Sequence, residues 1–149
     1  MRFFLCLFAL PLFSVTYTVN VSSDSNVPSG TFNAGAGTGD LRGCLNRVNI
    51  DSASTPGTYV IAFDSSISTI TLNGMLPILN LNHSGNNLTI NGSGASGGRV
   101  IIDGASTYPG FFAYQGTISL TNRTIQNTLS RGGNGSGGGL GAGGGPAAL

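Results

Sequence analysis

Few residues in this sequence could act as a nucleophile or a base, and they stand far apart. There are two cysteines, Cys6 and Cys44, and one histidine, His83. A catalytic cysteine needs a basic partner, but His83 stands in the polar stretch 80–85 and Cys44 falls among apolar residues. The sequence therefore predicts a small buried cysteine and a solvated loop histidine, not a nucleophilic pair.

Paired carboxylates would indicate a second chemistry, the cleavage of polysaccharides. A hydrolase needs two carboxylates that face one groove, and a lyase needs several acidic oxygens around Ca²⁺ with an Arg or Lys base. Every acidic residue here is an aspartate, and no two are adjacent or separated by a single residue: Asp24, Asp40, Asp51, Asp64 and Asp103. Asp40 is expected to cap a helix, Asp24 and Asp51 to lie in loops, and Asp64 and Asp103 to close strands. We therefore assign no catalytic residue and no metal ligand.

Charge and motifs predict no cofactor and no nucleic-acid partner. The formal net charge is +1 and the six arginines are spread singly, so no basic face can follow a phosphate backbone. The sequence has no Gly-Lys pair of a phosphate-binding loop and no Cys-x-x-Cys, and its Gly-rich stretches follow no strand-to-helix transition.

The composition favours strands and turns. Every basic residue is Arg and every acidic residue is Asp, so Lys and Glu, two good helix formers, are missing. In their place the chain uses Ser, Thr, Asn, Gly, Val and Ile, which suit short strands separated by tight turns. The composition therefore predicts an all-β class.

An apolar run at the N-terminus is typical of a secretory signal. Arg2 provides a positive charge, residues 3–13 form an apolar run interrupted by Pro11, and residues 14–16 suit cleavage. The run is shorter than the roughly 20 apolar residues that cross a bilayer. Residues 1–16 are predicted to be a signal peptide, with a buried N-terminal strand or core helix as the alternative. After removal of the signal, Cys44 alone could not form an intramolecular disulfide.

The elements expected to position these side chains are short strands and one helix. Residues 17–21 alternate with period two, as a half-buried strand does. After Asp40 a helix is expected over residues 41–49, because four residues of its apolar face recur at helical spacing: Leu41, Cys44, Leu45 and Val48. Gly43 weakens this helix by about 1 kcal/mol relative to alanine, so the helix should depend on packing.

From Thr58 onward, short apolar segments repeat, each closed by polar residues. The last three closures, at Asn91, Asp103 and Gln115, recur every twelve residues. Such short strands favour a solenoid, with an irregular all-β sandwich as the alternative. Alternate side chains are expected to point inward and to stack on their equivalents one coil away: Leu88 and Ile90, Val100 and Ile102, Phe112 and Tyr114, and Ile118 and Leu120.

The order of these segments carries a family resemblance. Residues 39–49 are similar to a segment written SLRxALxxAN, residues 59–78 to ITF…ITLT…LPxI, and residues 88–104 to LTIxG…VTIDG. Together they resemble the N-terminal part of bacterial right-handed parallel β-helix surface proteins, namely autotransporter passenger domains and polymorphic outer-membrane-protein-like adhesins. The resemblance implies an all-β, right-handed parallel β-helix (solenoid) fragment with a short N-terminal capping helix.

The chain also departs from this family. Arg123 stands where the pattern has an apolar residue, and Gly43 and Cys44 replace a better helix-forming pair. Such proteins meet the outer membrane through a translocator that this chain lacks, so we expect a truncated piece. The expected organisation is a signal peptide at 1–16, the cap and first coils at 17–131, and a Gly-rich flexible tail at 132–149.

The resemblance implies a secreted or outer-membrane-associated protein with a structural or adhesive role and no catalysis. Its partners would be a host-surface protein or a glycan, contacted by a face rich in Asn, Thr and Ser. The alternative is a truncated β-helix polysaccharide lyase or hydrolase, because the same fold carries that chemistry. Two carboxylates that face one groove would distinguish the enzyme from the binding protein.

Overall fold

The computed structural model describes residues 13–25 and 29–131. In this part of the chain one α-helix, α1 (Leu41–Ser52), precedes most of the strands, and two short 3-10 turns, η1 (Gly92–Gly94) and η2 (Ser96–Gly98), follow β7. The strands, in chain order, are β1 (Ser14–Val19), β2 (Phe32–Asn33), β3 (Thr38–Gly39), β4 (Thr58–Phe63), β5 (Thr69–Thr71), β6 (Leu79–Asn80), β7 (Asn87–Asn91), β8 (Val100–Asp103), β9 (Ala113–Gln115), β10 (Thr117–Thr121) and β11 (Arg123–Gln126).

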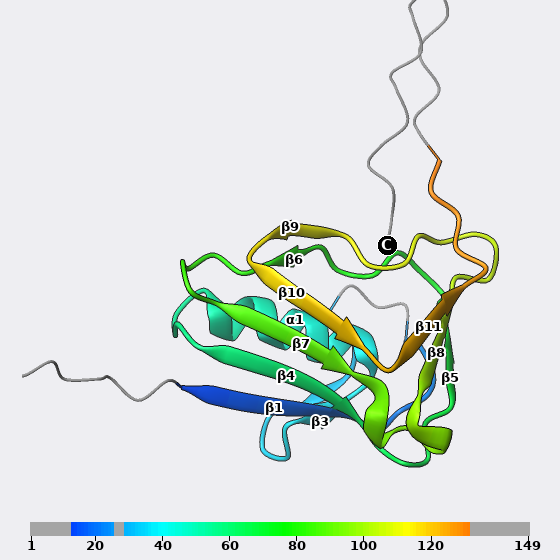
Figure 1. Cartoon of the computed structure of the whole chain (residues 1–149), viewed down its shortest axis with the longest axis horizontal. Coiled ribbons are helices and arrows are strands. Elements are labelled where there is room, and N and C mark those ends of the chain that lie inside the picture. The colour runs from blue at the N-terminus through cyan, green and yellow to red at the C-terminus, as the bar shows by residue number, and fades with distance from the viewer. Residues whose placement is uncertain (1–12, 26–28, 132–149) are drawn as a thin grey trace, which may run out of the picture.

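The largest sheet is a parallel stack with an antiparallel hairpin at one side. Figure 1 shows β1, β4, β7 and β10 side by side, and each pairs with the next in parallel. The register aligns inward side chains, since Tyr59 is paired with Leu88 and Leu88 with Ile118. β1 also pairs in parallel with β3, which pairs antiparallel with β2, so the sheet order is β10-β7-β4-β1-β3-β2.

Two smaller sheets lie beside the first one. β5, β8 and β11 form a parallel sheet in which Ile70 is paired with Ile102 and Ile102 with Ile125. β6 and β9 form a parallel pair along the upper side of Figure 1. Inward residues of the three sheets meet in one core, which includes Tyr59, Ile61, Ile70, Leu79, Leu88, Ile90, Val100 and Ile102, each at most 1% exposed.

The predicted fold class is wrong. The chain is a mixed α/β protein, because α1 spans twelve residues and supplies buried side chains to the core. Its largest sheet mixes parallel and antiparallel pairs, and the described strands form no closed solenoid. The hairpin of β2 and β3 is not among the elements that the sequence predicted. In the structure Asn33 Oδ1 accepts hydrogen bonds from the backbone N–H groups of Gly35 and Ala36, which closes the turn between β2 and β3.

The twelve-residue spacing was predicted to separate stacked strands, but it separates strands of different sheets. Consecutive strands β7, β8 and β9 lie in three different sheets, so Leu88, Val100 and Phe112 are not stacked equivalents. A strand of the large sheet meets its neighbour after more than twice that spacing, as the pair of Leu88 with Ile118 shows. The inward positions of β7 and β8 are nevertheless buried as predicted.

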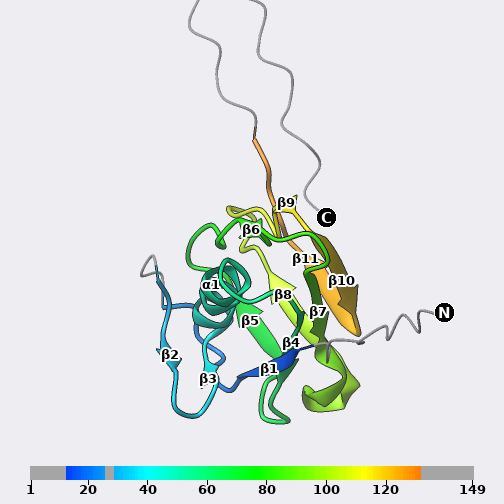
Figure 2. The same cartoon turned by 90° about the vertical axis from the view of Figure 1, so that its left-hand side faces the viewer.

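The helix forms where it was predicted, and its cap is the predicted residue. Asp40 Oδ1 accepts the backbone N–H of Gly43 at 2.6 Å, and Leu41, Cys44, Leu45 and Val48 are buried. The helix runs three residues further than expected, to Ser52. Figure 2 shows it nearly end-on, on the side of β2 and β3, and it contacts β1, β3, β4 and β6.

Among the described residues, one end of the three sheets is uncovered. Each sheet ends there in an edge strand, β10, β11 or β9, and no further strand of the described residues pairs with these edges. Inward residues Ile118, Leu120 and Ile125 are only half-buried, although their partners one layer below are at most 1% exposed. Arg123 joins Ile118 and Leu120 in lining a hollow of about 210 Å³. The predicted inward position of Ile118 and Leu120 is therefore reached only in part, because no further layer of the described residues covers them.

The described residues bear on one predicted boundary, the end of the signal peptide at residue 16. Ser14, Val15 and Thr16, assigned to the signal peptide, belong to β1 and are paired with Thr58, Tyr59 and Val60. The remainder of the predicted signal up to residue 12, and the predicted flexible tail at 132–149, lie outside the described residues.

Candidate binding site

The aspartates that could have carried catalysis instead form hydrogen bonds and ion pairs that hold the fold together. Asp24 forms a bidentate, buried ion pair with Arg42, with both nitrogen-to-oxygen distances at 2.7 Å. Arg42 Nη1 donates to the Met75 carbonyl at 2.6 Å, and the Asn73 N–H donates to Asp24. The hydrogen bond to Asp24 raises the pKa of Arg42. Asp24 lies in a loop as predicted, but it is buried, and its pairing with an arginine eighteen residues away has no local sequence signal.

Asp51 has a comparable structural role. It lies on α1 and not in the predicted loop. Its carboxylate accepts a hydrogen bond from Arg47 Nε at 2.7 Å and one from the hydroxyl of Tyr17 on β1, so it joins helix to sheet. Burial, followed by the hydrogen bond to Asp51, raises the pKa of Tyr17 to about 12.

Asp64 and Asp103 hold the turns that follow their strands, as predicted. Asp64 accepts the N–H and the hydroxyl of Ser66, and the backbone hydrogen bond is the main cause of its lowered pKa. Asp103 accepts from Gln126 at 2.9 Å, from the N–H of Ala105 and from the side chain of Asn127, and the Gln126 hydrogen bond is the largest cause of its lowered pKa. These two carboxylates stand at the ends of strands in two different sheets.

Cys44 and His83 do not form a site. Cys44 is fully buried on α1, and its burial raises the thiol pKa to about 12. His83 is exposed, and its Nε2 lies 2.7 Å from the carbonyl oxygen of Ala53. Among the described residues, no group of three or more His, Cys, Asp or Glu could hold a metal ion.

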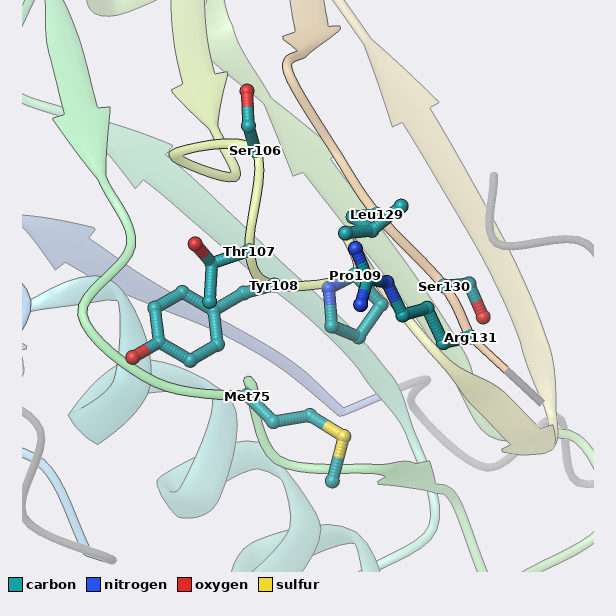
Figure 3. Close-up of a pocket in the computed structure, with 8 residues that line it drawn as sticks. All are labelled: Met75, Ser106, Thr107, Tyr108, Pro109, Leu129, Ser130 and Arg131. Atoms are coloured by element: carbon teal, nitrogen blue, oxygen red, sulfur yellow. The ribbon is translucent and has the colours of Figure 1, made fainter. Parts of the chain in front are cut away.

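A hollow of about 600 Å³ opens between two loops that follow strands of the second sheet. Figure 3 shows Met75 and the ring of Tyr108 on one side, Leu129, Ser130 and Arg131 on the other, and Pro109 between them. The loops are held together because the Leu129 N–H donates to the Tyr108 carbonyl at 3.0 Å. Met75 is 63% exposed, and its backbone is fixed by Arg42. The hollow is lined by apolar and aromatic side chains, hydroxyl groups and one guanidinium.

A second groove, of about 510 Å³, lies beside the C-terminal half of α1 and the β6–β9 pair. It is lined by three amide side chains, an aliphatic one and a phenol: Asn49, Asn80, Asn82, Ile78 and Tyr114. Asn49 fixes one wall, because its Nδ2 donates to the Ile78 carbonyl at 2.8 Å and its Oδ1 accepts the N–H of Asn80 at 3.0 Å. Ile78 is 50% exposed and Tyr114 is 73% exposed.

Tyr114 owes its position to a bulge in β9. Leu79 is paired with Ala113 and Asn80 with Gln115, so Tyr114 is an extra residue opposite one step of β6. The hydrogen bonds agree, since the N–H of Leu79 donates to Phe112 and that of Leu81 to Gln115. The prediction that Phe112 and Tyr114 point inward is therefore wrong, because period-two alternation fails where a bulge adds a residue. No local sequence signal marks this bulge.

Comparisons of the chain with family models, with curated proteins and with solved structures found no match. The resemblance to autotransporter passengers stays a prediction. Within the described part of the chain, no helix is long and apolar enough to span a membrane.

Proposed function

We propose that this chain is part of an exported surface protein, of the autotransporter-passenger kind that its motifs resemble, with an adhesive or structural role and no catalysis. One observation supports this most. The two large open hollows are lined by amide, hydroxyl, apolar and aromatic groups and one guanidinium, whereas all five aspartates of the chain have structural hydrogen bonds elsewhere. Cleavage of a glycosidic bond would need two carboxylates that face one groove.

The partners that suit such surfaces are a host-surface protein or a glycan. Tyrosine and asparagine supply adaptable contact area at low entropic cost, as they do in antibody binding loops. The near-neutral chain, with its scattered arginines, is a poor match for a nucleic-acid backbone.

Binding can be tested with the exported protein. We expect the purified chain to bind cultured epithelial cells or an array of neutral and anionic glycans in a saturable way, and to release no product from polysaccharides by mass spectrometry. Saturable binding without turnover supports the proposal. Absence of binding to both surfaces, or formation of shortened saccharides, would overturn it.

Export is tested separately by fractionating the native cells. The proposal predicts the protein in the extracellular or outer-membrane fraction, with an N-terminus downstream of the apolar run. Recovery of a chain with intact Met1 from the cytoplasm would contradict export.

A further inference from the structure

We infer that the groove at Tyr114 binds a neutral, hydroxyl-rich saccharide, with the tyrosine ring as its stacking platform. This inference rests on the proposed binding function and assigns it a site and a ligand class. The groove draws its lining from α1, from the segments before and after β6, from β6 and from β9. Its volume of about 510 Å³ falls within the roughly 300–1,000 Å³ usual for small-ligand pockets.

Tyr114 stands at an irregularity in the pairing of β9 with β6. Tyr114 is the extra residue at the shift in register between β6 and β9, and 73% of it is exposed. Bulges are used next to functional sites to re-aim a side chain. A sugar ring has an apolar face of C–H groups, which suits the electron-rich face of a tyrosine ring, and Ile78 extends the apolar area.

The polar part of the lining selects a neutral ligand. Its polar groups, besides the Tyr114 hydroxyl, are amides, which can donate and accept hydrogen bonds as sugar hydroxyls do. No charged side chain is among the five residues that line the groove. An anionic sugar would find no guanidinium or ammonium here, in contrast to the hollow of Figure 3, which includes Arg131.

Asn80 adds a reason for the groove to accept a hydroxyl group. Its Oδ1 is covered and has no hydrogen-bond partner among the described residues. An unsatisfied buried acceptor is costly, so a donor that reaches it is favoured. A turn of the Asn80 amide toward the groove would present this acceptor to a sugar hydroxyl. Asn49 keeps the wall in place, because both ends of its own amide are already engaged.

The test is a titration of the ¹⁵N-labelled protein with cellotetraose, maltotetraose and chitotetraose, and with trigalacturonate as the anionic comparison. We expect at least one neutral oligosaccharide to shift the side-chain amide signals of Asn80 and Asn82 and the backbone signal of Tyr114. Tyr114→Ala should lose at least about tenfold in affinity, and Tyr114→Phe should stay within about threefold of the parent. Val21→Ala, at an exposed apolar residue that lines neither hollow, is the matched control and should bind as the parent does.

The outcomes separate this inference from the proposed function. Neutral sugars that leave the Asn80, Asn82 and Tyr114 signals unchanged, full binding by Tyr114→Ala, or preference for trigalacturonate would each overturn the inference. If the protein still binds cells or other glycans in those cases, the proposed function stands with its site elsewhere. If it binds neither cells nor glycans, both fail.

Discussion

At the scale of single residues, Gly43 favours the fold although glycine disfavours a helix. An ideal Cβ at this position would lie 2.2 Å from the carbonyl oxygen of Thr31. Thr31 cannot easily withdraw, since its N–H donates to Asp40 at 3.0 Å and its carbonyl accepts from Asp40 at 3.0 Å. The glycine that weakens the helix locally is the residue that lets the helix dock.

Replacement of Gly43 by alanine should therefore destabilise the protein, although propensity alone predicts a gain of about 1 kcal/mol. We expect a loss of about 1–3 kcal/mol from overpacking against the Thr31 backbone, measured by urea unfolding. Ile50→Ala, at a 61% exposed position of the same helix, is the control and should change stability little. An increase in stability for Gly43→Ala would show that the close approach is not maintained in solution.

The buried ion pair between Asp24 and Arg42 predicts a large effect of removing one partner. Arg42→Met leaves Asp24 charged and buried, so we expect a loss of about 3–5 kcal/mol in unfolding free energy. Arg47→Met removes a more exposed pair with Asp51 and should cost below about 1 kcal/mol. Equal losses for the two variants in chemical denaturation would contradict the assigned difference in burial.

Ionisation of Tyr17 is expected to lower the stability of the folded protein at alkaline pH. Its pKa is about 12 in the folded protein and near 10.0 in its ordinary state, so folding favours the protonated phenol. A raised pKa contributes stability that is complete below pH 10 and is lost as the pH rises toward 12. Unfolding free energy measured from pH 8 to pH 11.5 should therefore decline above pH 10, and less steeply in Tyr17→Phe. The same slope in both proteins would rule out Tyr17 as a source.

At the scale of elements, β1 connects the predicted signal peptide to the folded part of the chain. Besides the pairs made by Ser14, Val15 and Thr16, the Phe13 carbonyl accepts the N–H of Thr58 at 2.8 Å. A cut after Thr16 would remove half of this strand. The structure thus adds a folding requirement to a segment that the sequence assigned to export alone.

A chain that begins at Tyr17 should be less stable than one that begins at Phe13. It loses three ladder positions against β4 and uncovers one edge of Tyr59, so its thermal midpoint should fall by several degrees, as about 1 kcal/mol does in a domain of this size. Differential scanning calorimetry of the two purified chains measures the difference. Identical midpoints would mean that Ser14–Thr16 contribute nothing to the fold.

At the scale of the whole molecule, stability should decrease from the strands β1 and β3 that α1 contacts to the edge strands β10 and β11. β7 lies between β4 and β10, and β8 between β5 and β11, whereas β10 and β11 are sheet edges. Edge strands open more readily because fewer contacts must be broken.

Hydrogen exchange should reproduce this gradient. In dilute solution, amides of Leu88–Ile90 and Val100–Ile102 should exchange more slowly than those of Ile118–Ile125. Repeating the measurement over a range of protein concentrations controls for association through the open edges. Equal protection of the two sets at every concentration would mean that the open end is covered.

The sequence by itself determined the local features of this protein. Asp40 and the spacing from Leu41 to Val48 predicted the helix and its cap, and the apolar alternation predicted β7 and β8 with their buried faces. These features depend on neighbours within a few residues, which a sequence displays directly.

Only the tertiary structure decided how those pieces combine. It paired Asp24 with Arg42, explained Gly43 through Thr31, placed β7, β8 and β9 in three sheets, and added an antiparallel hairpin to what the sequence predicted as a β-solenoid. It also placed Tyr114 at a bulge in β9, where its exposed side chain lines the groove. Each of these outcomes depends on contacts between residues distant in the chain, and neither periodicity nor composition records which distant residues will meet.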